Sequence, residues 1–293
     1  MIDLHERLSE FSYGYGITRE VQNLLSDVAI ETVPFMPSLI QEDELGFDVG
    51  FNRPGAALLL QFKLGQSLRR FVRGYNCFAV PALDKPFFRF SVNTAEPDGQ
   101  FETLLKAEYD GAETYYVAPI FADWPEYARL FETGAVLEQS ILVTPSTIRN
   151  ALVAQGSPDG MHRVVYDTNS VYVCSEPYQV SDTRKTSLVE GVLQRVVAEG
   201  ENLAKTVRRI YEGFDHRSSI RRLRPDALLQ AERALSSAGS IGERTPEPKR
   251  KQERNQRLEQ LRKRARIEDD AVSAALGLEL WALGIQLILA SRD

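Results

Sequence analysis

Hydrophobic residues recur along this chain at two spacings, which predict where helices and strands form. Apolar side chains return every three or four residues over 18–31, where Thr18 can cap a helix, and again over 98–109. A nearly continuous apolar run at 56–64 is typical of a strand buried on both faces. Shorter strands are expected at 47–52, 87–90, 114–121, 140–144, 162–166 and 171–174.

Turn sequences join two pairs of these strands. Residues 52–55, Asn-Arg-Pro-Gly, predict a hairpin between the strands at 47–52 and 56–64. Residues 167–170, Asp-Thr-Asn-Ser, predict a second hairpin, and the charged stretch at 65–74 is expected to be helical. The first 180 residues therefore predict an α/β or α+β core around a central mixed sheet.

The pattern changes after Pro177, where apolar residues keep a helical spacing over 184–213. Pro225 can start a further helix, and the composition of 236–242 is that of a flexible linker. A last helix is expected over 270–291. We therefore predict three parts: an α/β domain at 1–180, a helical connector at 181–242, and a basic helix followed by an apolar helix at 243–293, for binding or oligomerisation. Removal of residues 243–293 is then expected to leave a folded first domain.

Charge divides the chain at the same place. The formal net charge is -6, but residues 1–180 hold 13 Lys and Arg against 24 Asp and Glu, and 181–293 hold 22 against 17. The run 249–266, with nine Lys and Arg and two Glu, fits phosphate contacts, or equally a solvated linker helix or a coiled-coil segment. Its candidate nucleic-acid contacts are Lys249, Arg250, Lys251, Arg254, Arg257, Arg262, Lys263 and Arg264.

Cysteine content and the N-terminal sequence point to a cytoplasmic protein. Cys77 and Cys174 are too few for a zinc site, and the first residues lack the pattern of a signal peptide. Residues 271–290 are long enough to cross a bilayer, but Glu279 near their middle favours a buried or oligomerising helix. We therefore expect no membrane anchor, and association with a second copy or a partner subunit through the C-terminal helices.

The sharpest chemical signal lies in the first predicted hairpin. Asp48 stands on one strand, and Gln61 and Lys63 stand two residues apart on the next, so that these two share a face. Burying an ammonium group without a partner is costly, so a lysine in an apolar strand indicates a catalytic or binding site. The alternative is an ordinary hairpin in which Lys63 extends its ammonium to solvent.

Asp48 followed by Gln61-Phe62-Lys63 resembles the PD-(D/E)XK nuclease superfamily, in the Gln-x-Lys variant of Mrr-like restriction enzymes. The resemblance covers about residues 15–110 and implies a restriction-endonuclease-like core. It implies that Asp48 and the amide oxygen of Gln61 hold Mg²⁺, or Mn²⁺ in its place. Lys63 would then act on the attacking water or on the scissile phosphate.

The resemblance also implies a glutamate from the helix that precedes the hairpin. Glu20 is the candidate catalytic residue, and Glu44 is the second, as a metal ligand; Glu44 belongs to the acidic run 42–48, which also fits a solvated turn. Gln61 stands where an acid is usual, and this leaves two functions open. One is a metal-dependent nuclease of bacterial antiviral-defence or restriction type, with DNA favoured over RNA. The other is a non-catalytic binding or assembly protein with a degenerate nuclease-like fold.

Overall fold

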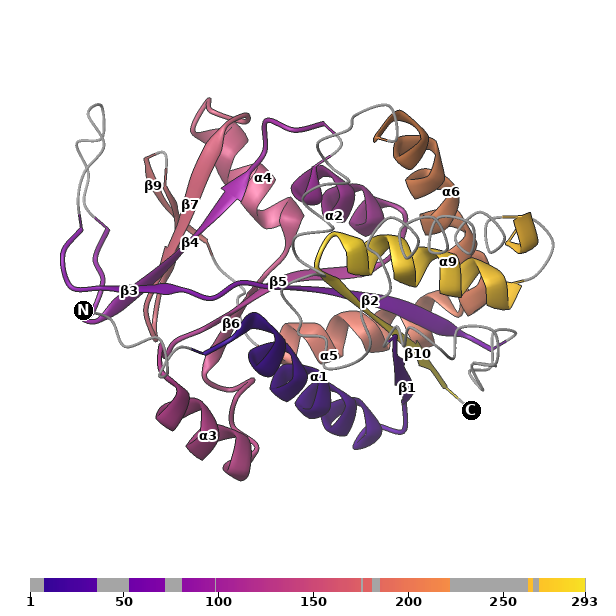
Figure 1. Cartoon of the computed structure of the whole chain (residues 1–293), viewed down its shortest axis with the longest axis horizontal. Coiled ribbons are helices and arrows are strands. Elements are labelled where there is room, and N and C mark those ends of the chain that lie inside the picture. The colour runs from indigo at the N-terminus through magenta and orange to yellow at the C-terminus, as the bar shows by residue number, and fades with distance from the viewer. Residues whose placement is uncertain are drawn as a thin grey trace, which may run out of the picture.

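Two five-stranded β-sheets form the framework of the chain (Figure 1). The first sheet is mixed, because β2 and β5 run parallel while every other neighbouring pair is antiparallel. Its order is β1 (Glu31–Pro34), β10 (Ile285–Ser291), β2 (Gly55–Phe62), β5 (Glu113–Pro119) and β6 (Ser140–Val143). This computed structural model describes residues 8–35, 53–71, 81–97, 99–174, 176–180, 185–221, 263–265 and 269–292.

The second sheet is antiparallel throughout. Its order is β3 (Gln66–Leu68), β4 (Phe87–Asn93), β7 (Met161–Tyr166), β8 (Val171–Cys174) and β9 (Pro177–Val180). The hairpin predicted between β7 and β8 is confirmed, and the Asp167 carboxylate accepts hydrogen bonds from the backbone N–H groups of Asn169 and Ser170 in its turn. The helix predicted over 65–74 is wrong at Gln66–Leu68, which form β3.

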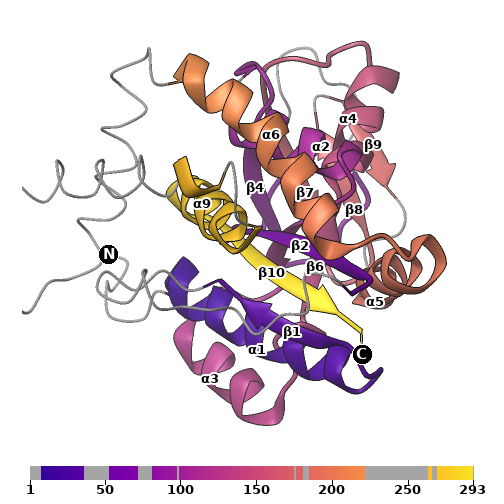
Figure 2. The same ribbon diagram turned by 90° about the vertical axis from the view of Figure 1, so that its right-hand side faces the viewer.

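Helices cover both faces of the first sheet (Figure 2). On one face lie α1 (Glu10–Ser26), α3 (Trp124–Thr133) and α5 (Lys185–Leu193), the last continuing into the π-helix η2 (Gln194–Glu199). On the other lie α2 (Gln100–Tyr109), α6 (Leu203–Arg221) and α9 (Asp269–Ala282), while α4 (Pro145–Ala154) packs on α2.

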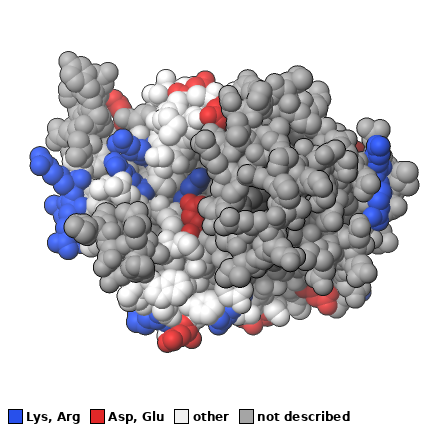
Figure 3. All heavy atoms as spheres, viewed as in Figure 1, with Lys and Arg blue, Asp and Glu red and all other residues white. Residues whose placement is uncertain are grey.

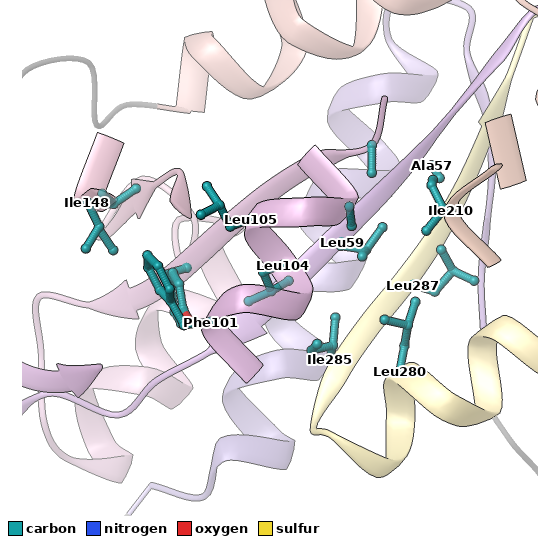
Figure 4. Packing of buried hydrophobic residues seen from close by; sticks show 14 of the residues in the cluster. Ala57, Leu59, Phe101, Leu104, Leu105, Ile148, Ile210, Leu280, Ile285 and Leu287 are labelled. Carbon is teal, nitrogen blue, oxygen red and sulfur yellow. The ribbon is translucent and has the colours of Figure 1, made fainter. Parts of the chain in front are cut away.

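Strand β2 is the centre of both hydrophobic cores. Ala57 and Leu59 point to the core shared with α2, α6 and α9, which Figure 4 shows, and Leu58 and Leu60 point to the core under α1 and α5. All four side chains are fully buried. The prediction of a strand buried on both faces is therefore confirmed.

The predicted helix at 270–291 is wrong in its second half. Helix α9 ends at Ala282, Gly284 adopts a left-handed φ of +73°, and the chain returns as β10 between β1 and β2. Both faces of β10 are buried, so its apolar residues have no period that separates a strand from a helix. Residues 269–292 therefore do not form a separate module, because β10 is an inner strand of the first sheet and α9 packs in the same core.

The predicted first hairpin is wrong as well. Strand β2 pairs with β10 along one edge and with β5 along the other, so both of its edges are occupied by other strands of the sheet. Residues 47–52 lie outside the described residues. Among the helices that the structure describes, none is both long and apolar enough to cross a membrane.

Candidate functional site

Gln61 and Lys63 lie at the carboxyl end of β2, next to the parallel strand β5. Strand alternation places both side chains on the same face as Leu59, toward α2, as predicted. Gln61 is buried, whereas Lys63 is partly exposed. The backbone N–H of Lys63 donates to the Val117 carbonyl, so Lys63 stands just where the pairing of β2 with β5 ends.

Gln100, the first residue of α2, joins the two side chains into one network. The Lys63 ammonium donates to Gln100 Oε1 at 2.9 Å, and Gln100 Nε2 donates to Gln61 Oε1. Gln100 Nε2 also donates to the Leu283 carbonyl at 2.7 Å, in the turn between α9 and β10. The network thus ties β2, α2 and the C-terminal strand together at one point.

The ammonium of Lys63 is held by a neutral amide in a partly apolar setting. It lies 6.0 Å from the centroid of the Tyr116 ring. Burial lowers the pKa of Lys63, and the carboxylate of Glu10 at the start of α1 raises it by a smaller amount. The hydrogen-bond partner of this ammonium is therefore neutral, so an anion can pair with it more readily than with a lysine already bonded to a carboxylate.

A pocket opens beside this network, between the start of α1 and the turn before β10. Gly284 lines it and also borders the network, because a Cβ on Gly284 would lie 3.9 Å from Gln61 Nε2. Gly14 lets α1 approach closely, since a Cβ there would lie 2.6 Å from the Phe62 ring. The pocket is lined by Glu10, Phe11, Gly14, Tyr15, Thr18, Phe62, Trp281, Gly284 and Gln286.

Glu20 does not join the network of Gln61, Gln100 and Lys63, and its predicted catalytic role stays a prediction. Its side chain is buried on the α1 face of the first sheet, opposite the face of Gln61. One carboxylate oxygen accepts the N–H of Val136 at 2.9 Å, and the other accepts the N–H of Leu137 at 2.7 Å. Glu20 therefore satisfies two buried backbone donors in the turn that follows α3.

Replacement of Glu20 should consequently reduce stability. In Glu20→Ala both N–H groups lose a charged acceptor, and we expect the free energy of unfolding to fall by about 3 kcal/mol. Urea denaturation measures this, with the exposed Glu132→Ala on α3 as the control that should leave stability unchanged. Wild-type stability together with lost metal binding in Glu20→Ala would support the catalytic assignment.

Sequence reasoning missed Glu10, Gln100 and the Leu283 carbonyl. The signal for Glu10 was present: Ser9 caps α1, because its hydroxyl accepts the Ser12 N–H, so the helix begins before the predicted Thr18. No local signal marks Gln100, which is separated from Gln61 by 39 positions and from Leu283 by 183.

The other predicted site residues fall mostly outside the described part. Lys263 and Arg264 are exposed, and they precede Ala265, which is buried and whose carbonyl accepts from Arg208. The residues outside are Asp48, Glu44, Lys249, Arg250, Lys251, Arg254, Arg257 and Arg262.

The described residues do not form a metal site by themselves. In the part of the chain that the structure describes, no three or more His, Cys, Asp or Glu side chains are placed to hold an ion. Gln61 Oε1, the predicted amide ligand, already accepts a hydrogen bond from Gln100. This oxygen keeps a second lone pair for a Mg²⁺ ion, which would have to take its carboxylates from outside the described residues.

Comparisons of this chain with protein-family models, with curated proteins and with solved structures gave no match.

Proposed function

We propose that this chain is a Mg²⁺-dependent nuclease whose Lys63 acts at the carboxyl end of β2. The observation that carries the proposal is the partly buried ammonium of Lys63, which hydrogen-bonds a neutral amide rather than a carboxylate. In the proposed role, this ammonium stabilises the negative charge that develops on the scissile phosphate, or orients the attacking water.

The position of Lys63 in the sheet supports an anion site. Sheets of mixed α/β proteins commonly bind ligands beyond the carboxyl ends of parallel strands, and Lys63 follows β2 next to the parallel β5. Helix α2 begins at Gln100 beside the same ammonium, so the positive end of its dipole adds to the local potential.

We propose Mg²⁺ as the metal ion because Asp48 and Gln61-x-Lys63 resemble the PD-(D/E)XK pattern. Asp48 and Glu44 are the carboxylates that this resemblance implies. The ion would supply Lewis-acid stabilisation at the scissile phosphate. DNA is the favoured substrate, in a restriction or antiviral-defence setting. The apolar residues of α9 and β10 are buried inside the chain and offer little surface for self-association.

Cleavage assays on the full chain test this function. End-labelled single-stranded DNA, duplex DNA and RNA are incubated with Mg²⁺, with Mn²⁺ or with EDTA. We expect cleavage only with a metal ion, and a loss of roughly 100-fold or more in Asp48→Ala, with Glu132→Ala as the control. Cleavage that persists in EDTA, or in Asp48→Ala at the wild-type rate, would contradict the proposal.

A second candidate is a non-catalytic nucleic-acid-binding protein that uses the same lysine. Two observations favour it: the Gln61 amide oxygen is engaged by Gln100, and the Glu20 carboxylate is engaged by backbone donors. This candidate predicts binding that is unaffected by Mg²⁺ and no cleavage of any of the three substrates.

A further inference from the structure

A continuous aromatic surface lies on α1 and α3, close to the pocket beside Lys63. Phe11 is 70% exposed, Tyr15 50% and Trp124 45%. Ring centroids lie 5.9 Å apart between Tyr15 and Phe131, 5.8 Å between Phe131 and Tyr127, and 5.3 Å between Tyr127 and Trp124. We call the four rings of Phe11, Tyr15, Phe131 and Trp124 the aromatic surface. The buried ring of Tyr127 lies beneath it and joins Phe131 to Trp124, and Phe11 lies one helical turn before Tyr15.

Packing of the fold does not require the exposed rings. Helix α1 is anchored to the core by Tyr13, Ile17 and Val21, which are fully buried. Phe11 and Tyr15 extend from the same helix into solvent, where large apolar side chains gain nothing from folding. Figure 3 shows uncharged atoms gathered over the lower edge of the molecule, where Figure 1 places α1 and α3, with charged residues at their border.

The aromatic surface is continuous with the pocket. Phe11 and Tyr15 belong to both, and Phe62 and Trp281 add two further aromatic rings to the pocket. Glu10 also lines the pocket and interacts electrostatically with Lys63. The exposed rings therefore continue into the aromatic pocket, which borders the network of Gln61, Gln100 and Lys63 at Gly284 and Glu10.

We propose that this aromatic surface and pocket stack unpaired nucleobases, so that the substrate of the site is single-stranded nucleic acid. This inference rests on the proposed function and specifies its substrate. An unpaired base offers a flat apolar face to the rings, and its phosphate offers a negative charge to Lys63, whose hydrogen-bond partner is the neutral Gln100 amide. Arg19, 4.3 Å from the centroid of the Phe131 ring, places a second cation at the same surface.

Duplex nucleic acid fits this arrangement less well, because its bases are stacked on one another and present no free face to a ring. An apolar protein segment would fit the rings but would offer no negative charge to the two cations Arg19 and Lys63. Unpaired nucleotides are the class of ligand that matches both the rings and the cation.

Binding in EDTA separates this inference from catalysis. The probes are a fluorescent oligothymidylate of about 20 nucleotides and a duplex of the same length, followed by fluorescence anisotropy. We expect the full chain to prefer the single strand, and Phe11→Ala/Tyr15→Ala to weaken its binding roughly 30-fold. The matched control is Tyr109→Ala/Tyr178→Ala, which removes two exposed rings, 70% and 46% exposed, from α2 and β9 and should bind as the wild type does.

Tryptophan fluorescence gives a second readout. The chain has two tryptophans, Trp124 on the aromatic surface and Trp281 in the pocket. In Trp281→Phe the remaining signal comes from Trp124 alone, and oligothymidylate should quench it because the base stacks close to the indole.

Failure of the inference and failure of the proposed function give different results. Three results would each overturn the inference, even if the chain cleaves DNA. They are wild-type affinity in Phe11→Ala/Tyr15→Ala, tighter binding of the duplex than of the single strand, and unchanged Trp124 fluorescence on addition of oligothymidylate. If the chain binds oligothymidylate through the aromatic surface but cleaves no substrate in Mg²⁺ or Mn²⁺, the aromatic site is supported and the nuclease function is contradicted.

Discussion

Deletion of residues 283–293 should abolish cooperative folding. This deletion removes β10, whose seven residues are all buried and which pairs with β1 on one side and with β2 on the other. Burial of five apolar side chains of this size contributes about 10 kcal/mol, which is comparable with the whole stability of an ordinary domain. Circular dichroism should then show no cooperative thermal transition.

The matched control is deletion of residues 292–293 alone, which leaves β10 complete and should keep the transition. If the chain had an independent domain at 1–180 and a separate module at 243–293, the longer deletion would keep a cooperative transition. A cooperative transition near the wild-type temperature after loss of residues 283–293 would therefore contradict the sheet order described above.

Elements whose pattern is local could be predicted from the sequence. The apolar run of β2 and the turn between β7 and β8 carry their own signals, and the structure confirms both. Helices α3 and α4 were missed although each has a capping residue, Asp123 or Thr144, followed by a proline in the first turn. These two signals were present in the sequence.

Strand β10 could not be predicted in the same way. Its residues are apolar on both faces, and its partners are β1 and β2, which lie more than two hundred positions earlier in the chain. The spacing of its apolar residues is compatible with a buried helix as well, so the segment is a strand only because it pairs with β1 and β2.

In the candidate site, too, the residues placed by local pattern could be predicted and those placed by tertiary structure could not. Two-residue spacing places Gln61 and Lys63 on one face, and this could be predicted because strand alternation is local. Glu20 lies on a helix near the predicted position, but which face of the sheet that helix covers is a tertiary property. Gln100 reaches the site only through the crossover that carries α2, so its role could not be inferred from spacing.

Replacement of Lys63 by methionine should remove function without loss of stability. If the ammonium stabilises the developing charge on the phosphate, its loss should slow cleavage roughly 100- to 1000-fold. Methionine keeps the length and the apolar stem, and it removes a charge that burial disfavours. We therefore expect a free energy of unfolding equal to that of the wild type or higher.

The pH dependence of stability should follow from the same shift. The pKa of Lys63 is lower in the folded state than in the unfolded chain, so between these two values the unfolded state binds more protons. The contribution of Lys63 to wild-type stability should therefore rise with pH in that window. Any gain in the free energy of unfolding of Lys63→Met over the wild type is then largest at neutral pH and decreases as pH rises through the lowered pKa. Urea denaturation over a series of pH values measures this difference.

The rate of Mg²⁺-dependent cleavage of end-labelled single-stranded DNA by Lys63→Met tests the central claim most directly. The wild type and Lys85→Met, which removes an exposed lysine before β4, are measured beside it. The proposed role of Lys63 predicts equal rates for these two proteins and a rate at least roughly 100-fold lower for Lys63→Met, with an unchanged or higher melting temperature. A folded Lys63→Met that cleaves at the wild-type rate, or a wild type that cleaves no nucleic acid, would contradict it.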